Sequence, residues 1–256
     1  MPRHKVVDLL FLVVLGMMMI AEMITDIPWI WYAVLVAFYI ALCSFGAFIL
    51  SMQFFTRVRW KGDVDSNAIA ITFDDGPVDR TAGILKILGE HQVPATFFCI
   101  GSRIEGNEAL LLQINNAGHL IGNHSFYHGK TFDLMSAQSV INELTNTDRK
   151  IESVIGKRPR YFRPPYGVTN PMIGKAVEEL GHTVVGWNVR SFDTITKDPA
   201  RLLKRVTKDL KGGDVVLFHD YCESTQQILG EFITMAHQKG LRIISLDALL
   251  NEKAYR

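Results

Sequence analysis

The sequence predicts an α/β protein built on a parallel sheet, as a barrel or an open sheet, preceded by a transmembrane helical hairpin. Three observations support this prediction. Residues 27–56 carry no charge, short apolar runs alternate with amphipathic stretches over the rest of the chain, and polar residues follow the apolar runs. At 256 residues, the chain is long enough for one catalytic domain and a small appendage.

Two apolar runs predict that residues 1–56 form a membrane hairpin. Residues 27–56 are uncharged, and at ~1.5 Å per helical residue this run exceeds the ~30 Å hydrocarbon core of a bilayer. The shorter run at residues 9–21 lies between Asp8 and Glu22, so it is either a second span or the core of a signal peptide. No convincing small-x-small cleavage site follows this run, which favours its retention.

Basic residues flank both ends of this hairpin. Arg3 and Lys5 precede it, and Arg57, Arg59 and Lys61 follow it, whereas the connecting loop carries only acids. The positive-inside rule then places both ends in the cytoplasm, within a multi-pass protein of the cell membrane. If the first run does not span, the rule does not settle the orientation, so the face of the membrane that carries the soluble part stays open.

Residues 57–66 are polar and predict a short linker, and residues 67–256 predict a single α/β domain. Seven short apolar runs have the character of buried strands, at residues 68–73, 95–100, 120–122, 161–162, 183–187, 215–218 and 242–245. Residues 136–155 predict a helix that ends at Gly156. Residues 169–180 predict another, which begins with Asn170 and Pro171 and ends at Gly181.

Charge and cysteine content exclude several classes of function. The formal net charge is +1 and the pI is near 7.8, so the chain has no broad electrostatic attraction to nucleic acid, and no such partner is expected. Cys43, Cys99 and Cys222 lie far apart and form no CxxC pair. They therefore predict neither a disulfide framework nor a thiolate zinc site.

Polar residues follow the predicted strands at the point where each strand ends. Asp74 and Asp75 follow the first strand, His124 the third and Arg163 the fourth, and His219 ends the sixth. Because the carboxyl ends of parallel strands share one face, we expect these side chains to form one site.

The two histidines of this site have a spacing that suits a metal ion. His124 and His128 are four residues apart, on one side of a helical turn, so two imidazoles can meet one ion. A carboxylate would complete a set of two histidines and one carboxylate with open positions. The spacing alone is weak support, because histidine pairs often cap or pack, and the neighbouring aspartates strengthen it.

Five segments together resemble, in order, the motifs of the polysaccharide deacetylase family, also known as NodB-homology or carbohydrate esterase family 4 proteins. They are residues 72–77 (TFDDGP), 124–128 (HSFYH), 163–167 (RPPYG), 187–193 (WNVRSFD) and 216–219 (VLFH). The resemblance covers about residues 67–250, nearly all of the predicted domain. It implies a distorted (β/α)7 barrel.

The resemblance implies roles for the metal ligands and the base. Asp75, His124 and His128 are expected to bind one divalent metal ion, with zinc as the first choice and cobalt or nickel as alternatives. Asp74 is expected to be the general base that takes a proton from the water that the ion activates. Arg163 is expected to keep Asp74 charged and oriented.

The resemblance also implies substrate contacts. The backbone amide of Tyr166 is expected to stabilise the oxyanion, and His219 to protonate the amine leaving group. Leu217 is expected to line a pocket for the acetyl methyl, although its spacing fits ordinary strand core equally well. Trp187, together with Tyr166, is expected to contact the substrate.

The fourth motif departs from the family pattern. Many members carry an aspartate that pairs with the arginine of the third motif, at the position of Arg190, and a tryptophan at the position of Thr194. Arg190 must turn away from the site or add a second cation near Arg163, and Asp193 is a candidate to take over the pairing. This departure bears on the substrate subgroup more than on the reaction.

The expected function is hydrolysis of N-acetyl or other N-acyl groups on amino sugars of a polysaccharide or a polyprenyl-linked glycan, beside membrane lipid. Two alternatives stay open, an O-acyl carbohydrate esterase and a catalytically silent sugar-binding barrel. The same activated water attacks esters, which keeps the first alternative open, and Arg190 favours the second. The acceptor glycan, the choice between acetyl and formyl, and the oligomeric state are left open by the sequence.

Overall fold

The computed structural model describes residues 3–64 and 66–256. Its helices are α1 (Arg3–Glu22), α2 (Ile30–Phe48), α3 (Thr81–Glu90), α4 (Gly101–Ile104), α5 (Glu108–Asn116), α6 (Ala137–Ile155), α7 (Pro171–Leu180), α8 (Pro199–Thr207), α9 (Glu223–Gln238) and α10 (Leu246–Leu250). Its strands are β1 (Val58–Arg59), β2 (Ala68–Gly76), β3 (Thr96–Cys99), β4 (Leu120–Asn123), β5 (Tyr161–Phe162), β6 (Thr183–Val185), β7 (Val189–Arg190), β8 (Val215–His219) and β9 (Arg242–Ile243). Short 3-10 turns are η1 (Leu50–Met52), η2 (Phe132–Leu134) and η3 (Pro165–Gly167).

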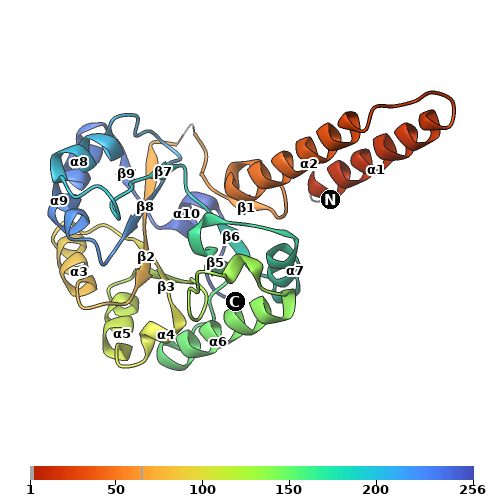
Figure 1. Ribbon diagram of the computed structural model, residues 1–256. Helices are drawn as coiled ribbons and strands as arrows, with labels where there is room; N and C mark the ends of the chain where they lie inside the picture. Colours follow the sequence, from red (N-terminus) through yellow and green to blue (C-terminus); the bar gives the residue numbers. More distant parts are fainter. Residues whose placement is uncertain (1–2, 65) are drawn as a thin grey trace.

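The strands form one curled parallel sheet with helices around its outside (Figure 1). The strand order is β1-β6-β5-β4-β3-β2-β8-β7, and β9 pairs with β2. All seven predicted strands are present, and the two-residue strands β1 and β7 add the two ends of this order. The prediction of a distorted (β/α)7 barrel is confirmed, as a sheet that curls like an incompletely closed barrel.

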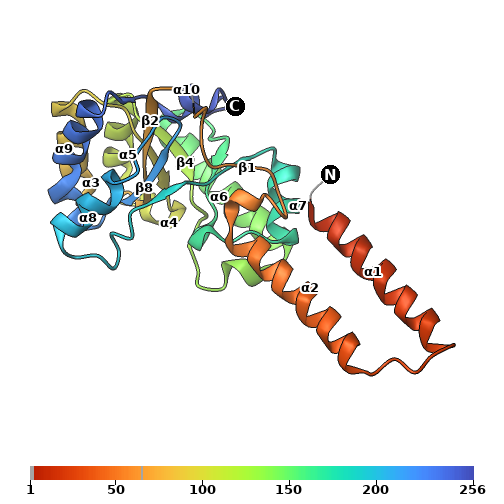
Figure 2. The ribbon, with the colours of Figure 1, turned by 90° about the horizontal axis from the view of Figure 1, so that it is seen from above.

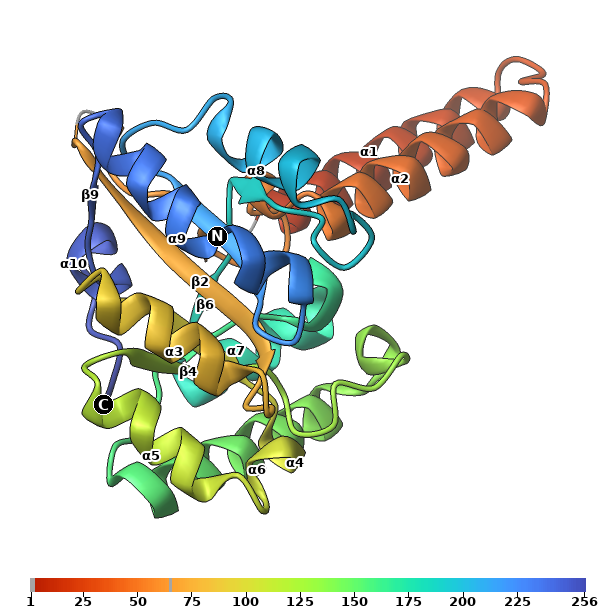
Figure 3. The same cartoon turned by 90° about the vertical axis from the view of Figure 1, so that its left-hand side faces the viewer.

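Alternation along the central strand β2 separates the outer core from the interior of the curled sheet. Ile71 and Phe73 are fully buried in a cluster with side chains of α3 and α9, which cover the outer side of β2 (Figure 3). Thr72 and Asp74 have the opposite parity, so their side chains face the other side of the sheet. In the neighbouring strand β8, His219 pairs in register with Asp74. The fold therefore directs polar side chains of two adjacent strands into one interior.

The first two helices form an antiparallel hairpin that extends away from the domain (Figures 1 and 2). Each is long and apolar enough to cross a membrane, judged by length and composition, and only 6% of each apolar window is buried. Phe11 stacks on Tyr39 with ring centroids 4.3 Å apart, and the Tyr39 hydroxyl donates to Asp8. Both chain ends of the hairpin lie at the domain, and its connecting loop lies at the far tip.

The end of α2 is attached to the domain. The amide of Thr169 donates to the carbonyl oxygen of Ala47 at 3.0 Å, and Leu50 is buried in a cluster with Phe162. Helix α7 approaches the following segment so closely that a Cβ atom at Gly174 would lie 2.9 Å from the carbonyl oxygen of Phe55. Strand β1 lies inside the predicted linker and pairs with β6, so the sheet begins directly after the hairpin.

Candidate metal centre and active site

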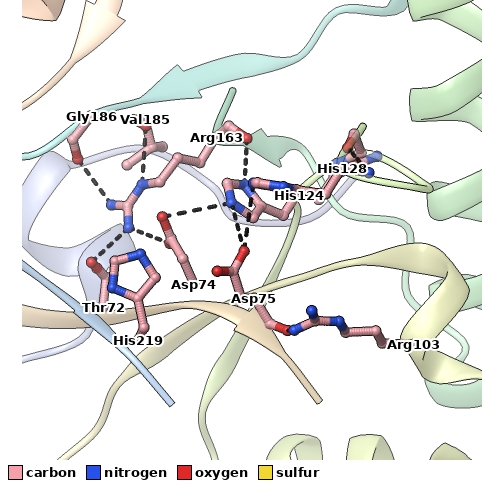
Figure 4. A network of polar contacts seen from close by, with 12 residues as sticks. Thr72, Asp74, Asp75, Arg103, His124, His128, Arg163, Val185, Gly186 and His219 are labelled. Carbon is pink, nitrogen blue, oxygen red and sulfur yellow. Dashed lines mark hydrogen bonds and ion pairs between the residues drawn. The ribbon is translucent and has the colours of Figure 1, made fainter. Parts of the chain in front are cut away.

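A bulge at the end of β2 sends its two aspartates in different directions. The register against β3 shifts between Asp74 and Gly76, so Asp75 is the extra residue, and its φ is +76°. Figure 4 shows Asp74 directed toward Arg163, and Asp75 toward the histidines. The Arg103 guanidinium donates to the carbonyl oxygen of Asp75 at 2.5 Å. The bulge thus allows two neighbouring carboxylates to serve two different partners.

His124 and His128 lie on an irregular loop after β4, so the expectation of a helical turn is wrong. Ser125 and His128 adopt left-handed φ values of +63° and +52°, which interrupt any helix. The Glu143 carboxylate on α6 accepts hydrogen bonds from the backbone amides of residues 126 and 127, both at 2.9 Å. The His128 amide donates to the Ser125 hydroxyl at 3.0 Å. These contacts, rather than helical hydrogen bonds, bring the two imidazoles together.

The three residues expected to bind the metal converge. His124 Nε2 lies 3.4 Å from Asp75 Oδ1, and His128 Nε2 lies 3.5 Å from the same oxygen. The candidate ligand atoms all lie within 4.8 Å of one another. Asp75 Oδ1 is buried and makes no hydrogen bond to any described residue. Because a buried unpaired carboxylate oxygen is costly, this donor set fits a divalent cation.

A hydrogen bond to a backbone carbonyl orients the imidazole of His124. Its Nδ1 lies 2.7 Å from the carbonyl oxygen of Arg163, and because a carbonyl can only accept, Nδ1 carries the proton. The lone pair of Nε2 is then directed toward Asp75, as a metal ligand requires.

Electrostatics keep two of the ligands in the form that binds metal. Burial raises the pKa of Asp75, but the contact with His124 and the positive charges that His124, His128 and His219 carry in the acidic range outweigh it, and the net pKa is well below its usual range. Burial and the neighbouring His124 lower the pKa of His128 to about 4. At neutral pH, Asp75 is therefore a carboxylate and His128 a neutral imidazole. Burial lowers the pKa of His124, but the two aspartates and the carbonyl oxygen of Arg163 raise it more.

Arg163 holds Asp74 from the interior of the barrel. Its fully buried guanidinium donates from Nη1 to Asp74 Oδ1 at 2.7 Å and to the Thr72 hydroxyl at 2.8 Å. The carbonyl oxygens of Gly186 and Val185 accept its remaining hydrogen bonds, at 2.9 Å from Nη2 and 3.3 Å from Nε. Burial lowers the pKa of the guanidinium, and the charge of Asp74 opposes this shift. Two backbone carbonyls thus bind the part of Arg163 that an aspartate was expected to bind.

Asp193 pairs with His219, so its expected pairing with Arg163 is wrong. His219 Nδ1 lies 2.8 Å from Asp193 Oδ1, and both the His219 amide and the Thr225 hydroxyl donate to Oδ2, at 2.7 Å and 2.6 Å. Burial lowers the pKa of His219, but the hydrogen bond and charge of Asp193 outweigh it, and the net pKa is raised. Burial raises the pKa of Asp193, and the contacts with His219 lower it overall.

Arg190 is exposed and turned toward aromatic rings. Its guanidinium lies 4.7 Å from the ring centroid of Phe192 and 5.7 Å from that of Trp187. Trp187 also lies 5.5 Å from the guanidinium of Arg163. Among the described residues, the Arg190 guanidinium forms no ion pair with Asp74 and packs on these aromatic rings instead.

The remaining predicted residues border the same interior. Tyr166 has a left-handed φ of +59° within η3, and its half-exposed ring packs against His128 at 4.8 Å. The hydrogen bonds of this turn are donated by the amides of Gly167 and Val168, the two residues after Tyr166. Leu217 is buried two residues before His219 in β8 and therefore shares its side of the strand.

Sequence reasoning missed the supporting residues on α6. Asn123 donates to Asp148 Oδ1 at 2.8 Å and accepts from the Ser125 amide at 2.9 Å. Glu143 and Asp148 are buried and lie in the apolar stripe of α6 with Val140, Leu144 and Ile151. Acids at core positions of an amphipathic helix need partners, so this stripe was a usable signal.

Comparisons with known proteins agree with this geometry. The family described as polysaccharide deacetylase matches residues 61–185. A peptidoglycan-N-acetylglucosamine deacetylase of Bacillus cereus is 32% identical over 202 residues, which cover 77% of this chain and 94% of that relative. The peptidoglycan-N-acetylglucosamine deacetylase PgdA of Listeria monocytogenes is 33% identical over 72% of this chain, and the match spans only 39% of the length of PgdA.

A solved structure shares the fold. The Bc1960 peptidoglycan N-acetylglucosamine deacetylase superimposes with a TM-score of 0.75 at 27% identity, over 78% of this chain and 95% of that chain.

Proposed function

Because the chain belongs to the polysaccharide deacetylase family, we propose that it is a metal-dependent hydrolase that removes N-acetyl groups from amino sugars of a glycan. One observation carries this proposal. A set of one carboxylate and two imidazoles, in which His124 and one carboxylate oxygen are buried and that oxygen has no hydrogen-bond partner, lies beside a second carboxylate that an arginine holds in place. Such a set can bind a cation and also accept a proton from water.

The proposed metal ligands are Asp75, His124 and His128. A divalent ion held by these residues would lower the pKa of a water molecule to about 7 and polarise the amide carbonyl. Two imidazoles and one carboxylate with an open position are typical of catalytic zinc, so zinc is the first choice, with cobalt or nickel as alternatives.

Asp74 is the proposed general base. Its Oδ1 accepts from Arg163, and its Oδ2 lies 3.8 Å from His124 Nε2, on the side of the proposed ligands. Arg163 therefore fixes one oxygen and keeps the carboxylate charged, while the other oxygen can take the proton of the attacking water. The attack forms the new carbon–oxygen bond on the acetyl carbonyl.

His219 is the proposed general acid. As the carbon–nitrogen bond breaks, His219 gives a proton to the departing amine, and the raised pKa of His219 increases the protonated fraction at neutral pH. We propose the amide of Tyr166 as the oxyanion donor. Leu217 and Trp187 are proposed to contact the acetyl group and the sugar.

The proposed substrates are N-acetylated amino sugars near a membrane. The relatives named for peptidoglycan support a glycan of this class, and the exposed apolar hairpin supports anchoring of the chain in membrane lipid, which also admits polyprenyl-linked amino sugars. We propose residues 1–56 as the membrane hairpin and residues 67–256 as the catalytic domain. The docked end of α2 supports a hairpin that stays with the domain.

The test is product release by the full-length, zinc-loaded protein. N-acetylglucosamine oligomers are expected to yield free amine at least about tenfold faster than acetylated xylan yields acetate. Faster release from xylan would favour the O-acyl esterase. Bound zinc without product from either substrate would favour a silent sugar-binding barrel.

A separate measurement tests the anchor. Intact mass of the membrane-bound protein is expected to include residues 1–22, whereas their removal would identify α1 as a signal sequence. Protease digestion of sealed vesicles then reports which face carries the domain.

A further inference from the structure

A cavity of about 810 Å³ lies where the base of the hairpin meets the domain. Its walls come from the start of α1, from residues 53–59 and from α7. Figure 2 shows the beginning of α1 beside α7, and the Arg3 guanidinium donates to the carbonyl oxygen of Met52 at 2.7 Å. The hairpin and the domain therefore build this cavity together.

The lining of the cavity is strongly cationic. Its six lysine and arginine side chains are Arg3, Lys5, Arg57, Arg59, Arg160 and Lys175. Two carboxylates, Glu178 and Glu252, oppose them. Among the described residues, Glu252 pairs with Arg59, so most of the cationic charge is not neutralised by ion pairs within the lining. The hydrogen bond from Arg59, with added effects of Arg160 and Arg57, lowers the pKa of Glu252.

The cavity is separate from the candidate active site. Arg57, Arg160 and His182 directly precede β1, β5 and β6. Because the strands are parallel, these residues lie at the amino ends of the strands. Asp74 and His219 lie at the opposite, carboxyl ends. A ligand in the cavity would thus leave the catalytic groups uncovered.

The position of the cavity relative to a bilayer indicates its ligand. α1 begins and α2 ends here, and both helices have about the length of the hydrocarbon core, so the cavity lies at the level where acyl chains give way to headgroups. Arg3 and Lys5 lie in the first turn of α1, and Arg57 lies between the end of α2 and β1. Arginine forks and lysine ammonium groups bind phosphate oxygens well, and anionic lipids attract basic residues at this level.

We propose that this cavity binds the phosphate headgroup of an anionic phospholipid and so holds the domain in a fixed position against the membrane. The inference rests on the proposed membrane anchoring of the hairpin. The occupant is a lipid of the surrounding bilayer, because the hairpin places the cavity at the headgroup layer. Free phosphate, which has the same chemistry, is the competing ligand in the test.

The test measures how tightly the full-length protein binds phosphatidylglycerol and phosphatidylcholine. The binding is measured in nanodiscs and, by native mass spectrometry, in detergent. The variant combines Arg57→Gln, Arg160→Gln and Lys175→Gln. The matched control combines Arg201→Gln, Lys204→Gln and Lys208→Gln, which remove the same charge from a second basic cavity along α8. Wild type and control are expected to bind phosphatidylglycerol about tenfold more tightly than phosphatidylcholine, and the cavity variant to lose this preference.

Each result has one meaning. A preference that survives in the cavity variant, or disappears equally in the control, overturns the proposal. The proposal is also overturned if inorganic phosphate stabilises wild type as much as phosphatidylglycerol does and this stabilisation is lost in the cavity variant, because the site would then bind free anions. If the cavity variant melts below wild type, the double variant Lys5→Gln and Lys175→Gln, with both side chains exposed, replaces it and is expected to lose part of the preference.

Incorporation into discs of phosphatidylcholine alone separates this inference from the anchor. Protein that incorporates without a preference for the anionic lipid refutes only the headgroup site. Protein that does not incorporate refutes the hairpin anchor, and the headgroup site with it. Deacetylation of soluble oligomers, measured on the same samples, reports the proposed enzymatic function independently of both.

Discussion

Replacing Asp193 with asparagine changes the acid strength of His219 while keeping the shape of the buried side chain. Asp193 Oδ1 lies 2.8 Å from His219 Nδ1, and Oδ2 accepts from the His219 amide. Burial lowers the pKa of His219, and Asp193 supplies the largest opposing effect. Asp193→Asn removes this effect, while burial and the weaker effects of Asp74 and Asp75 remain, so the pKa of His219 falls.

The size of this shift follows from the hydrogen bond that is lost. A hydrogen bond to a charged group contributes about 1.5–3 kcal/mol, and one pKa unit corresponds to about 1.4 kcal/mol, so the pKa of His219 should fall by about one to two units. An acid must be protonated to act, so activity declines as pH rises through its pKa. The basic limb of the pH profile should therefore move down by about one to two pH units.

The assay is kcat/KM against pH with a soluble N-acetylglucosamine oligomer at saturating zinc. Above the pKa of wild-type His219, the variant should be about ten to a hundred times slower, in line with the expected shift. Ser191→Ala is the control, because Ser191 accepts a hydrogen bond from the Asp193 amide but carries no charge. A basic limb that stays in place in Asp193→Asn would refute the assignment of His219 as the acid.

Three further results are expected. Glu143→Gln weakens the two charge-assisted hydrogen bonds that hold the loop carrying His124 and His128, so the zinc affinity measured in a competition titration should fall about tenfold. Unchanged affinity would mean that the conformation of this loop does not depend on Glu143. Arg190→Ala removes an exposed contact with Phe192, so the free energy of unfolding in chemical denaturation should fall by less than about 1 kcal/mol. The kcat of this variant should stay within about twofold of wild type, and a large loss of kcat would place Arg190 in the active site. Burial lowers the pKa of His119 from 6.5 to about 4, so between these pH values the unfolded chain binds a proton at His119 that the folded chain does not bind. The free energy of unfolding of wild type, measured in urea, should therefore fall by on the order of 3 kcal/mol between pH 6.5 and pH 4. His119→Asn keeps an acceptor for the Ala95 amide, and its free energy of unfolding should fall correspondingly less. An equal fall in both proteins would contradict this explanation.

The elements that local chemistry determines were predictable from the sequence. Ser136 accepts a hydrogen bond from the Ser139 amide at the start of α6, and Gly156 ends that helix with a left-handed φ of +69°. Strands β1 and β7 were not predictable, because two residues carry no periodicity. They form only where β6 and β8 offer an open edge.

The candidate site divides in the same way. Parallel topology alone brings the ends of β2 and β8 together, so the convergence of Asp74 and His219 followed from the strand pattern. The shape of the histidine loop depends on Glu143, and the partner of His219 lies 26 residues away at Asp193. Such long-range contacts leave no trace in local spacing, although the buried acids of α6 stand out in its apolar stripe.

Metal content measured together with turnover tests the central claim most directly. Wild type is expected to bind one zinc ion and release amine. Asp74→Asn is expected to bind the ion without turnover, because Asp74 is the proposed base and lies beside the three candidate ligands without being one of them. His124→Ala is expected to lose both the ion and turnover. A His124→Ala protein that keeps its zinc, or an Asp74→Asn protein that still releases amine, would contradict the account.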